Sequence, residues 1–265
     1  MRSLGPRLIL AVVLLLAMGS VSFAITNGVP DGNAHPYVGL IVFFNSAGPV
    51  WRCSGSLLSP TKVLTAGHCT AGTVSARVWF QEMMTDPAYP NGGPASYDGV
   101  TFTNPDFCVG CGNGVTEFIT RDVGVVRLVE PVPPNVVGAY ATLPQAGFVD
   151  ALPNKTKLDL VGYGFQEQIH GGGIPVWIGA KNRLVASSEL VSGKFSMSDE
   201  FLRIALNPGG GSGGTCFGDS GGPDLLAGSS MVLGVNSFMT NNNCAGTGYS
   251  QRVDIQDVLD WIASR

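Results

Sequence analysis

The sequence predicts an all-β protein of two lobes that ends in one α-helix. Glycine and proline are abundant, with 37 and 17 residues among 265, and only 13% of the residues are charged. Such a composition favours many short strands joined by turns. Apolar runs bounded by glycine, proline and asparagine recur along the chain. These predicted strands are Tyr37–Phe44, Ser56–Leu58, Lys62–Thr65, Ala76–Phe80, Val123–Leu128, Lys157–Gly162 and Met231–Phe238.

A proline cluster separates two sets of these strands. The segment Glu130–Asn135 holds three prolines, which cannot donate hydrogen bonds to a central strand ladder and therefore indicate a linker. We expect a first lobe over about residues 25–130 and a linker over about 131–153. The second lobe and the helix then occupy about residues 154–265.

One helix is predicted at the C-terminal end. Asp254 belongs to the residue types that cap helices, because its carboxylate accepts hydrogen bonds from the free N–H groups of the first turn. Apolar residues follow at the spacing of one helix face. These are Val258, Leu259 and Ile262.

The first 24 residues predict a signal peptide. Arg2 and Arg7 give a positive start, and small residues precede a cleavage site after Ala24. The apolar run Leu8–Met18 has 11 residues, which as a helix rise about 16 Å, against a hydrocarbon core of about 30 Å. We therefore expect cleavage, no membrane attachment of the mature protein, and secretion into an extracellular or other oxidising compartment.

The net charge and the cysteine content indicate which binding partners and metal sites to expect. The formal net charge is −4 and no basic stripe is present, so we expect no nucleic acid partner. Six cysteines in an exported chain predict disulfides, although six cysteines allow fifteen pairings. The close pair Cys108 and Cys111 favours a local disulfide, since two ligands cannot complete a tetrahedral zinc site. We expect neither a metal nor a cofactor.

The hexapeptide Gly218–Pro223 predicts a catalytic nucleophile. It places Ser220 on a glycine-rich turn, where backbone N–H groups can bind an oxyanion. The same residues fit the Gly-x-Ser-x-Gly elbow of α/β-hydrolases, which requires a histidine after the serine. That mechanism is excluded because every histidine precedes Ser220. The histidines are His35, His68 and His170.

His68 and Asp122 complete a candidate catalytic triad. His68 follows a strand-like run and precedes a cysteine, and Asp122 opens another apolar run. In a serine triad the histidine takes the serine proton, while the carboxylate fixes the imidazole tautomer and stabilises its charged form. The chain order His68, Asp122, Ser220 is one of those known for such triads.

Four short stretches carry a resemblance to a known family. They are Thr65–Cys69, Asp122–Val125, Gly162–Gly164 and Gly218–Pro223. Together they resemble secreted serine peptidases of the chymotrypsin (trypsin-like) family, over essentially all of Ile25–Arg265. The resemblance implies two six-stranded antiparallel β-barrels with a C-terminal α-helix. It also implies an endopeptidase that acts on proteins or peptides through an acyl-enzyme, and it leaves a protein inhibitor open as a further partner.

The resemblance also implies roles for individual residues. The N–H groups of Gly218 and Ser220 would form the oxyanion hole, and Ser237 would support Asp122 by a hydrogen bond. Two disulfides are implied in the same way. They join Cys53 to Cys69 and Cys216 to Cys244.

Activation is expected to involve the N-terminus of the mature chain. Family members become active when a freed Ile or Val amine pairs with the acid before the nucleophile, which here is Asp219. Cleavage after Ala24 would itself expose Ile25. We therefore expect no separate propeptide.

The resemblance also implies a specificity pocket. Gly214 stands where trypsin-like members hold an aspartate at the bottom of the pocket, and glycine supplies no charge. A non-basic, apolar residue is therefore expected before the scissile bond. Met239 could narrow the pocket entrance. The candidate pocket residues are Gly214, Thr215, Phe238, Met239 and Gly248.

A binding protein with this fold and little or no turnover is the alternative function. Such proteins usually lose a triad member or an oxyanion glycine, whereas this chain keeps all of them. Residues 82–104 are expected to form a long loop that is not a standard feature of the family. Whether this loop shapes substrate binding or is a neutral insertion stays open.

Overall fold

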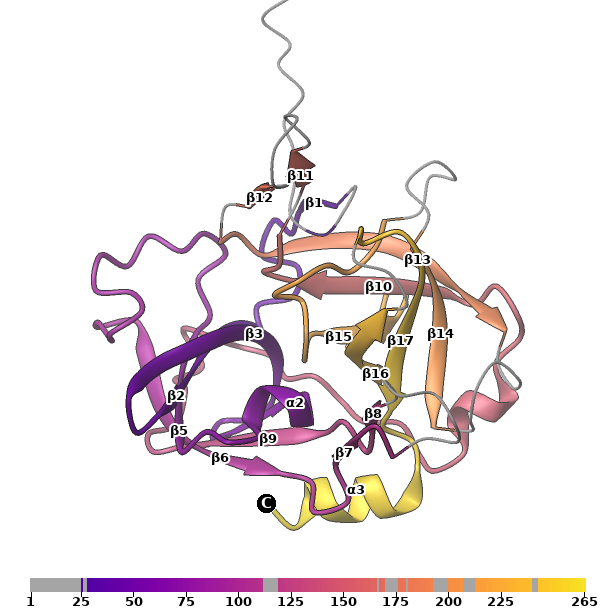
Figure 1. The fold of residues 1–265 in the computed structure, drawn as a ribbon, viewed down its shortest axis with the longest axis horizontal. Coiled ribbons are helices and arrows are strands. Elements are labelled where there is room, and N and C mark those ends of the chain that lie inside the picture. The colour runs from indigo at the N-terminus through magenta and orange to yellow at the C-terminus, as the bar shows by residue number, and fades with distance from the viewer. Residues whose placement is uncertain are drawn as a thin grey trace, which may run out of the picture.

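Two antiparallel β-barrels lie side by side (Figure 1). The computed structural model describes Ile25 and residues 28–111, 119–165, 167–169, 176–179, 181–192, 200–206, 213–239 and 243–265. The predicted signal peptide and His170 lie outside these residues. Each barrel has six strands, as the family resemblance implied.

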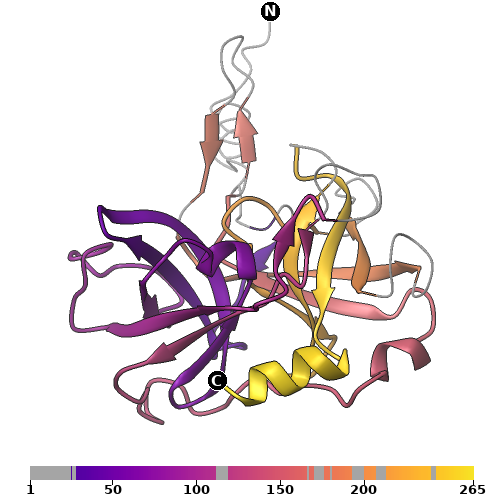
Figure 2. The same ribbon diagram turned by 60° about the horizontal axis from the view of Figure 1, so that its bottom comes forward.

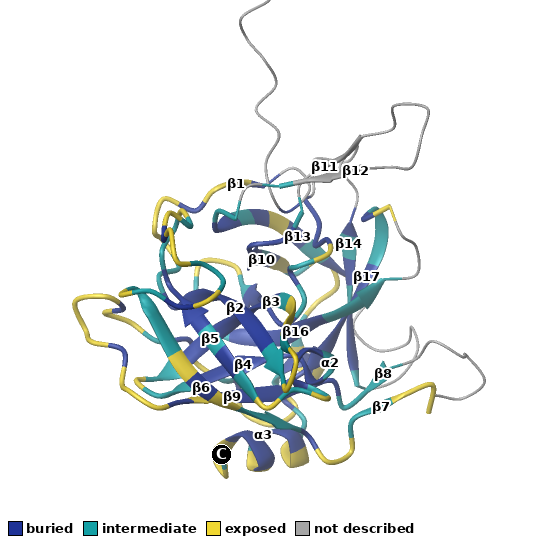
Figure 3. Cartoon of the chain, turned by 60° about the vertical axis from the view of Figure 1, so that its left-hand side comes forward, coloured by how far each residue is buried: buried dark blue, intermediate teal, exposed yellow. Residues whose placement is uncertain are grey.

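The first barrel encloses a core of aliphatic residues such as Ile41, Val63 and Val125. Around the barrel the strand order is β2-β3-β4-β9-β6-β5. Figure 3 shows β2, β4 and β5 mostly buried, whereas part of β6 and many of the turns are exposed. The strands are β2 (Val38–Asn45), β3 (Gly48–Ser59), β4 (Lys62–Thr65), β5 (Ser75–Trp79), β6 (Ser96–Thr103) and β9 (Gly124–Leu128).

The expected loop over residues 82–104 is a wrong prediction in its second half. Strand β6 occupies Ser96–Thr103 there and pairs with both β5 and β9, so that it closes the barrel. Gly99 is buried in this strand, while most of the other residues are exposed or half-buried. Because β6 has no continuous apolar run, its sequence does not show the usual strand pattern.

The second barrel consists of the ring β13-β10-β15-β16-β17-β14, closed by pairing of β14 with β13. Leucines such as Leu158, Leu160 and Leu233 fill its core. Two short hairpins lie outside the barrels: β7 (Cys108–Val109) with β8 (Ile119–Thr120), and β11 (Glu167–Ile169) with β12 (Val176–Ile178). The barrel strands are β10 (Lys157–Gly162), β13 (Leu184–Ser192), β14 (Phe201–Leu206), β15 (Pro223–Leu226), β16 (Val232–Met239) and β17 (Gly246–Arg252).

The C-terminal helix α3 (Gln256–Ala263) leaves the second barrel and packs on the first (Figure 2). Its buried residues are Val258, Trp261 and Ile262, so Trp261 takes the place expected for Leu259. The predicted cap is wrong: Ile255 precedes the helix, and Asp254 pairs instead with Arg252 at 2.8 Å. Among the described helices, none is long and apolar enough to cross a membrane.

The segment that follows the predicted signal peptide packs on the second barrel. Strand β1 (Val29–Pro30) pairs with β13, and Ile25 is fully buried in the second core. The expected boundary of the first lobe at residue 25 thus includes a segment that pairs with the other lobe.

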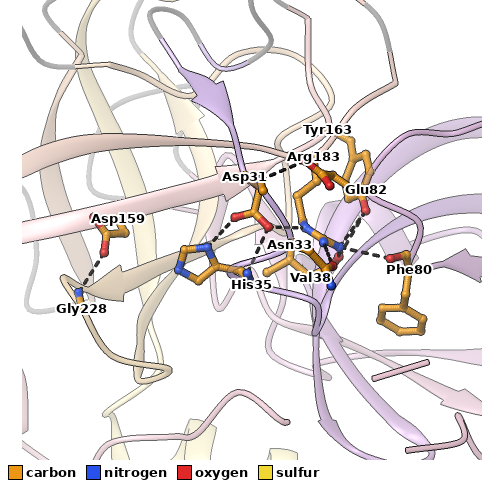
Figure 4. Close-up of polar contacts among 11 residues, drawn as sticks. Asp31, Asn33, His35, Val38, Phe80, Glu82, Asp159, Tyr163, Arg183 and Gly228 are labelled. Atoms are coloured by element: carbon orange, nitrogen blue, oxygen red, sulfur yellow. Dashed lines mark hydrogen bonds and ion pairs between the residues drawn. The ribbon is translucent and has the colours of Figure 1, made fainter. Parts of the chain in front are cut away.

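A buried ion pair fastens this segment to both barrels (Figure 4). The Nε atom of Arg183 lies 2.8 Å from Oδ2 of Asp31, and both side chains are fully buried. The Nη1 atom of Arg183 donates to the carbonyl oxygens of Val38 and Phe80 in the first barrel, at 3.0 and 3.1 Å. On the other side of Asp31, Nδ1 of His35 lies 2.6 Å from Oδ1. Arg183 therefore connects three segments that are distant in sequence.

Candidate active site

His68 and Asp122 contact each other on the side of the first barrel that faces the second. His68 lies on the one-turn helix α2 (Gly67–Thr70), and Asp122 lies just before β9. The distance between His68 Nδ1 and Asp122 Oδ2 is 2.8 Å, and the His68 backbone N–H donates to Asp122 Oδ1 at 2.7 Å. The carboxylate thus holds both the ring and the backbone of His68 in place.

The two groups shift each other's pKa. Burial alone would lower the pKa of His68, but the charge and the hydrogen bond of Asp122 raise it above the usual value. Burial alone would raise the pKa of Asp122, but the charge of His68 and hydrogen bonds from His68 and Ser237 lower it. This arrangement keeps Asp122 ionised and stabilises an imidazolium at His68.

Asp122 also forms hydrogen bonds with residues of the second barrel. The Ser237 hydroxyl donates to Oδ2 of Asp122. The Asp122 backbone N–H donates to Oε1 of Gln251 on β17 at 3.0 Å, a contact that the sequence did not suggest. Because Asp122 is fully buried, these partners offset the loss of its hydration.

Ser220 lies on the turn before β15 and lines the same hollow as His68. Its neighbour Gly221 has φ +79°, and a Cβ atom there would lie 2.1 Å from the Thr65 hydroxyl, so only glycine fits. No hydrogen bond joins Ser220 to His68 in the described part of the chain. His68 Nε2 lies 3.6 Å from Cys69 Sγ. Catalytic hydrogen bonds are often long without substrate and tighten when it binds.

The predicted oxyanion donors lie on a turn that is held by other hydrogen bonds. Neither the N–H of Gly218 nor that of Ser220 donates to any other described residue. Gly218 has φ +97°, a conformation that L side chains rarely adopt. Ser54 holds this turn: its N–H donates to the Ser220 carbonyl at 2.8 Å, and its hydroxyl donates to the Gly218 carbonyl at 3.0 Å. Sequence reasoning missed Ser54, since a serine inside a strand is not distinctive.

Asp219 is fully buried beneath this turn. Its carboxylate accepts hydrogen bonds from the N–H groups of Gly164 and Cys216, at 2.8 and 2.9 Å. Burial raises its pKa to about 7, although these donors and the charge of Arg52 lower it. Ala24 precedes Ile25 in the full chain, so the Ile25 nitrogen belongs to a peptide bond, and no described contact joins Ile25 to Asp219. Their pairing stays a prediction.

A second hollow adjoins Ser220 on the side of the second barrel. Of the five candidate pocket residues, Thr215, Phe238 and Met239 line it, and Gly214 and Gly248 do not. Gly248 is next to Met239 across the strand pair β16–β17. The remaining lining residues are Cys216, Ser220, Asn236 and Ser237, of which Asn236 was not predicted.

Two of the three disulfides among the described residues connect segments of the site. Cys53–Cys69 ties α2 to β3, and Cys216–Cys244 ties the segment before Ser220 to the segment before β17. The third joins Cys108 to Cys111 beside β7. Disulfides persist in oxidising compartments, which fits an exported protein.

Two β-barrels with a serine beside a histidine–aspartate pair between them define the class of two-barrel serine hydrolases. The family model described as Trypsin matches residues 26–262. The chain therefore belongs to the trypsin family and is a serine endopeptidase.

Relatives support this assignment. Serine protease 1 of Drosophila melanogaster is 27% identical over 260 residues, which cover 90% of this chain and 84% of that protein. Brachyurin of Leptuca pugilator is 30% identical over 229 residues, which cover 82% of this chain and 88% of that protein. The solved structure of HL collagenase superposes on this chain with a TM-score of 0.69 at 20% sequence identity. The match covers 91% of this chain and 97% of the collagenase chain, which shows that the two share a fold.

Proposed function

We propose that this protein is a secreted endopeptidase that cleaves peptide bonds through Ser220, His68 and Asp122. Ser220 attacks the scissile carbonyl, and His68 takes the serine proton and then gives it to the leaving amine. The N–H groups of Gly218 and Ser220 bind the oxyanion, where losing one such donor typically costs about 2.7–4 kcal/mol. Water then hydrolyses the acyl-enzyme by the same steps.

The contact between His68 and Asp122 carries this proposal. At 2.8 Å, with the second donor Ser237 on the same carboxylate, it provides an oriented general base. Ser220 borders the hollow into which His68 faces, and neither proposed oxyanion donor forms a hydrogen bond to another described residue. A protein that only binds its ligands would have no need for all of these features.

A serine-directed peptidyl phosphonate tests the proposal. We expect the folded mature protein to be modified at Ser220, located by mass spectrometry of the proteolytic peptides. Ser220→Ala is the matched control and should remain unlabelled. Absence of labelling in folded wild-type protein would instead support the alternative, a trypsin-fold binding protein.

Activation at the N-terminus forms part of the proposal. Among the described residues Asp219 forms no ion pair, and burial raises its pKa to about 7 despite two N–H donors and the charge of Arg52. An Ile25 ammonium would supply that charge. We expect N-terminal sequencing of the secreted protein to begin at Ile25, and one added alanine before Ile25 should lower activity. A different start with full activity would contradict this activation step.

For specificity, we propose a non-basic, apolar residue before the scissile bond. The hollow beside Ser220 is lined by uncharged residues, among them Phe238 and Met239. A positively charged side chain would lose its hydration there without gaining a partner. A peptide-library cleavage profile tests this, and a preference for Lys or Arg would refute it.

A further inference from the structure

Ser220 lies between two hollows of different chemistry. The first is the uncharged pocket beside Phe238 and Met239. The second, of about 270 Å³, is lined by Trp51, Arg52, Cys53, His68 and Ser220. Arg52 is the charged residue in this second hollow that the proposed mechanism does not use.

The proposed mechanism assigns one hollow to each side of the scissile bond. His68 must protonate the leaving amine, so the residues after the scissile bond pass on the His68 side of Ser220. The residue before that bond occupies the opposite pocket. The hollow lined by Trp51, Arg52 and His68 therefore receives the leaving-group residues. This inference rests on the proposed function.

The side chain of Arg52 is held in place beside the reaction centre. The guanidinium carbon lies 4.7 Å from the centre of the Phe165 ring, a cation–π contact. A Cβ atom built on Gly218 would lie 3.5 Å from Arg52 Nε, so the side chain runs next to the proposed oxyanion hole. Burial raises the pKa of Tyr89, and Arg52 opposes that rise, which places Tyr89 close to the guanidinium. A fixed cation loses little freedom when it binds a ligand.

Arg52 has no salt-bridge partner among the described residues. Within the described ranges it forms no ion pair, and the neutral Tyr89 side chain is a hydrogen-bonding neighbour that supplies no charge. Asp219 feels its charge but already accepts hydrogen bonds from two backbone N–H groups. The guanidinium charge therefore has no salt-bridge partner among the described residues, and a substrate carboxylate in the hollow would supply one.

We propose that Arg52 is a specificity residue that favours an acidic side chain, Asp or Glu, within two residues after the scissile bond. A carboxylate matches the planar fork of a guanidinium and can accept two hydrogen bonds. The half-buried position of Arg52 limits screening by salt, so the pair is stronger than a fully exposed one. A lysine at the same substrate position is repelled.

Internally quenched peptides that differ only after the scissile bond test this role. Each of the first two positions carries Glu, Gln or Lys in turn, and kcat/KM is measured for the wild type, Arg52→Gln, Arg52→Lys and Arg52→Glu. For the wild type we expect kcat/KM to be about tenfold higher with Glu than with Lys at one of these positions. The ratio should fall to about one in Arg52→Gln, recover in part in Arg52→Lys, and invert in Arg52→Glu.

The ratio separates specificity from a structural role. If Arg52 only braced Gly218, its variants would slow all peptides equally and leave the Glu-to-Lys ratio unchanged, which would overturn the proposal. Arg77→Gln removes the same charge from an exposed ion pair with Asp98 and should keep the wild-type ratio. A wild-type ratio near one at both positions would also overturn it. If no peptide is cleaved and the phosphonate fails to label Ser220, it is the proposed function that fails.

Discussion

Replacing Ser220 by alanine is expected to lower kcat for peptide hydrolysis by about 10⁶-fold. The variant has no nucleophile for His68 to activate, so no acyl-enzyme forms. The remaining rate would come from substrate binding and from the oxyanion hole. The substitution keeps the backbone N–H groups at positions 218 and 220. Initial rates on one quenched peptide at several enzyme concentrations provide the measurement.

A matched serine provides the control for this experiment. Ser229 lies in the turn between β15 and β16, where its hydroxyl donates to the Leu226 carbonyl. Ser229→Ala removes the same oxygen atom and should retain kcat within a few-fold, with a circular dichroism spectrum like that of the wild type. If Ser220→Ala lost less than about 100-fold while Ser229→Ala was unaffected, another residue would have to be the nucleophile.

Replacing Arg183 by methionine is expected to lower the free energy of unfolding by about 3–5 kcal/mol. The substitution leaves Asp31 buried with His35 as its remaining side-chain partner among the contacts in Figure 4. It also removes the donors to the Val38 and Phe80 carbonyls. Urea unfolding should be measured in the Ser220→Ala background, because that prevents self-digestion.

The effect of Arg183→Met should depend on pH. Burial alone would raise the pKa of Asp31, but hydrogen bonds from His35 and the contacts of Arg183 lower it. A carboxyl with a lowered pKa stabilises the fold above its unfolded-state pKa of about 3.9, and this stabilisation is lost as the pH falls through the folded-state pKa. The stability difference between the wild type and Arg183→Met should therefore be largest near neutral pH and shrink in acid.

An exposed ion pair serves as the control for Arg183. Lys157 lies 3.0 Å from Glu189 with 68% of its side chain exposed, and Lys157→Met should change stability by only about 0–1 kcal/mol. Adding Asp31→Leu to Arg183→Met removes the uncompensated charge and should recover part of the loss. A loss below about 1 kcal/mol for Arg183→Met, or no recovery in the double variant, would show that this pair does not fasten the barrels.

The candidate catalytic residues were predictable because each lies in a short motif with an unusual composition. Ser220 among glycines, His68 before a cysteine and Asp122 before an apolar run can be recognised without coordinates. Strand β6 could not be recognised in this way, because its residues are mostly half-buried without a continuous apolar run, and its strand character depends on its neighbours β5 and β9. The predicted helix cap was wrong for a similar reason. The Asp254 carboxylate forms an ion pair with Arg252 and does not cap the helix.

The sequence by itself determined the family resemblance, the two-lobed all-β class and the three residues proposed for catalysis. The tertiary structure decided which residues support them. Ser54, Gln251 and Arg52 lie in ordinary strands, and they reach the site only because the barrels bring residues far apart in the chain into contact. A residue whose chemistry depends on its neighbours in the sequence can be recognised from a local motif. A residue whose role depends on a distant partner is found only when the folded chain supplies that partner.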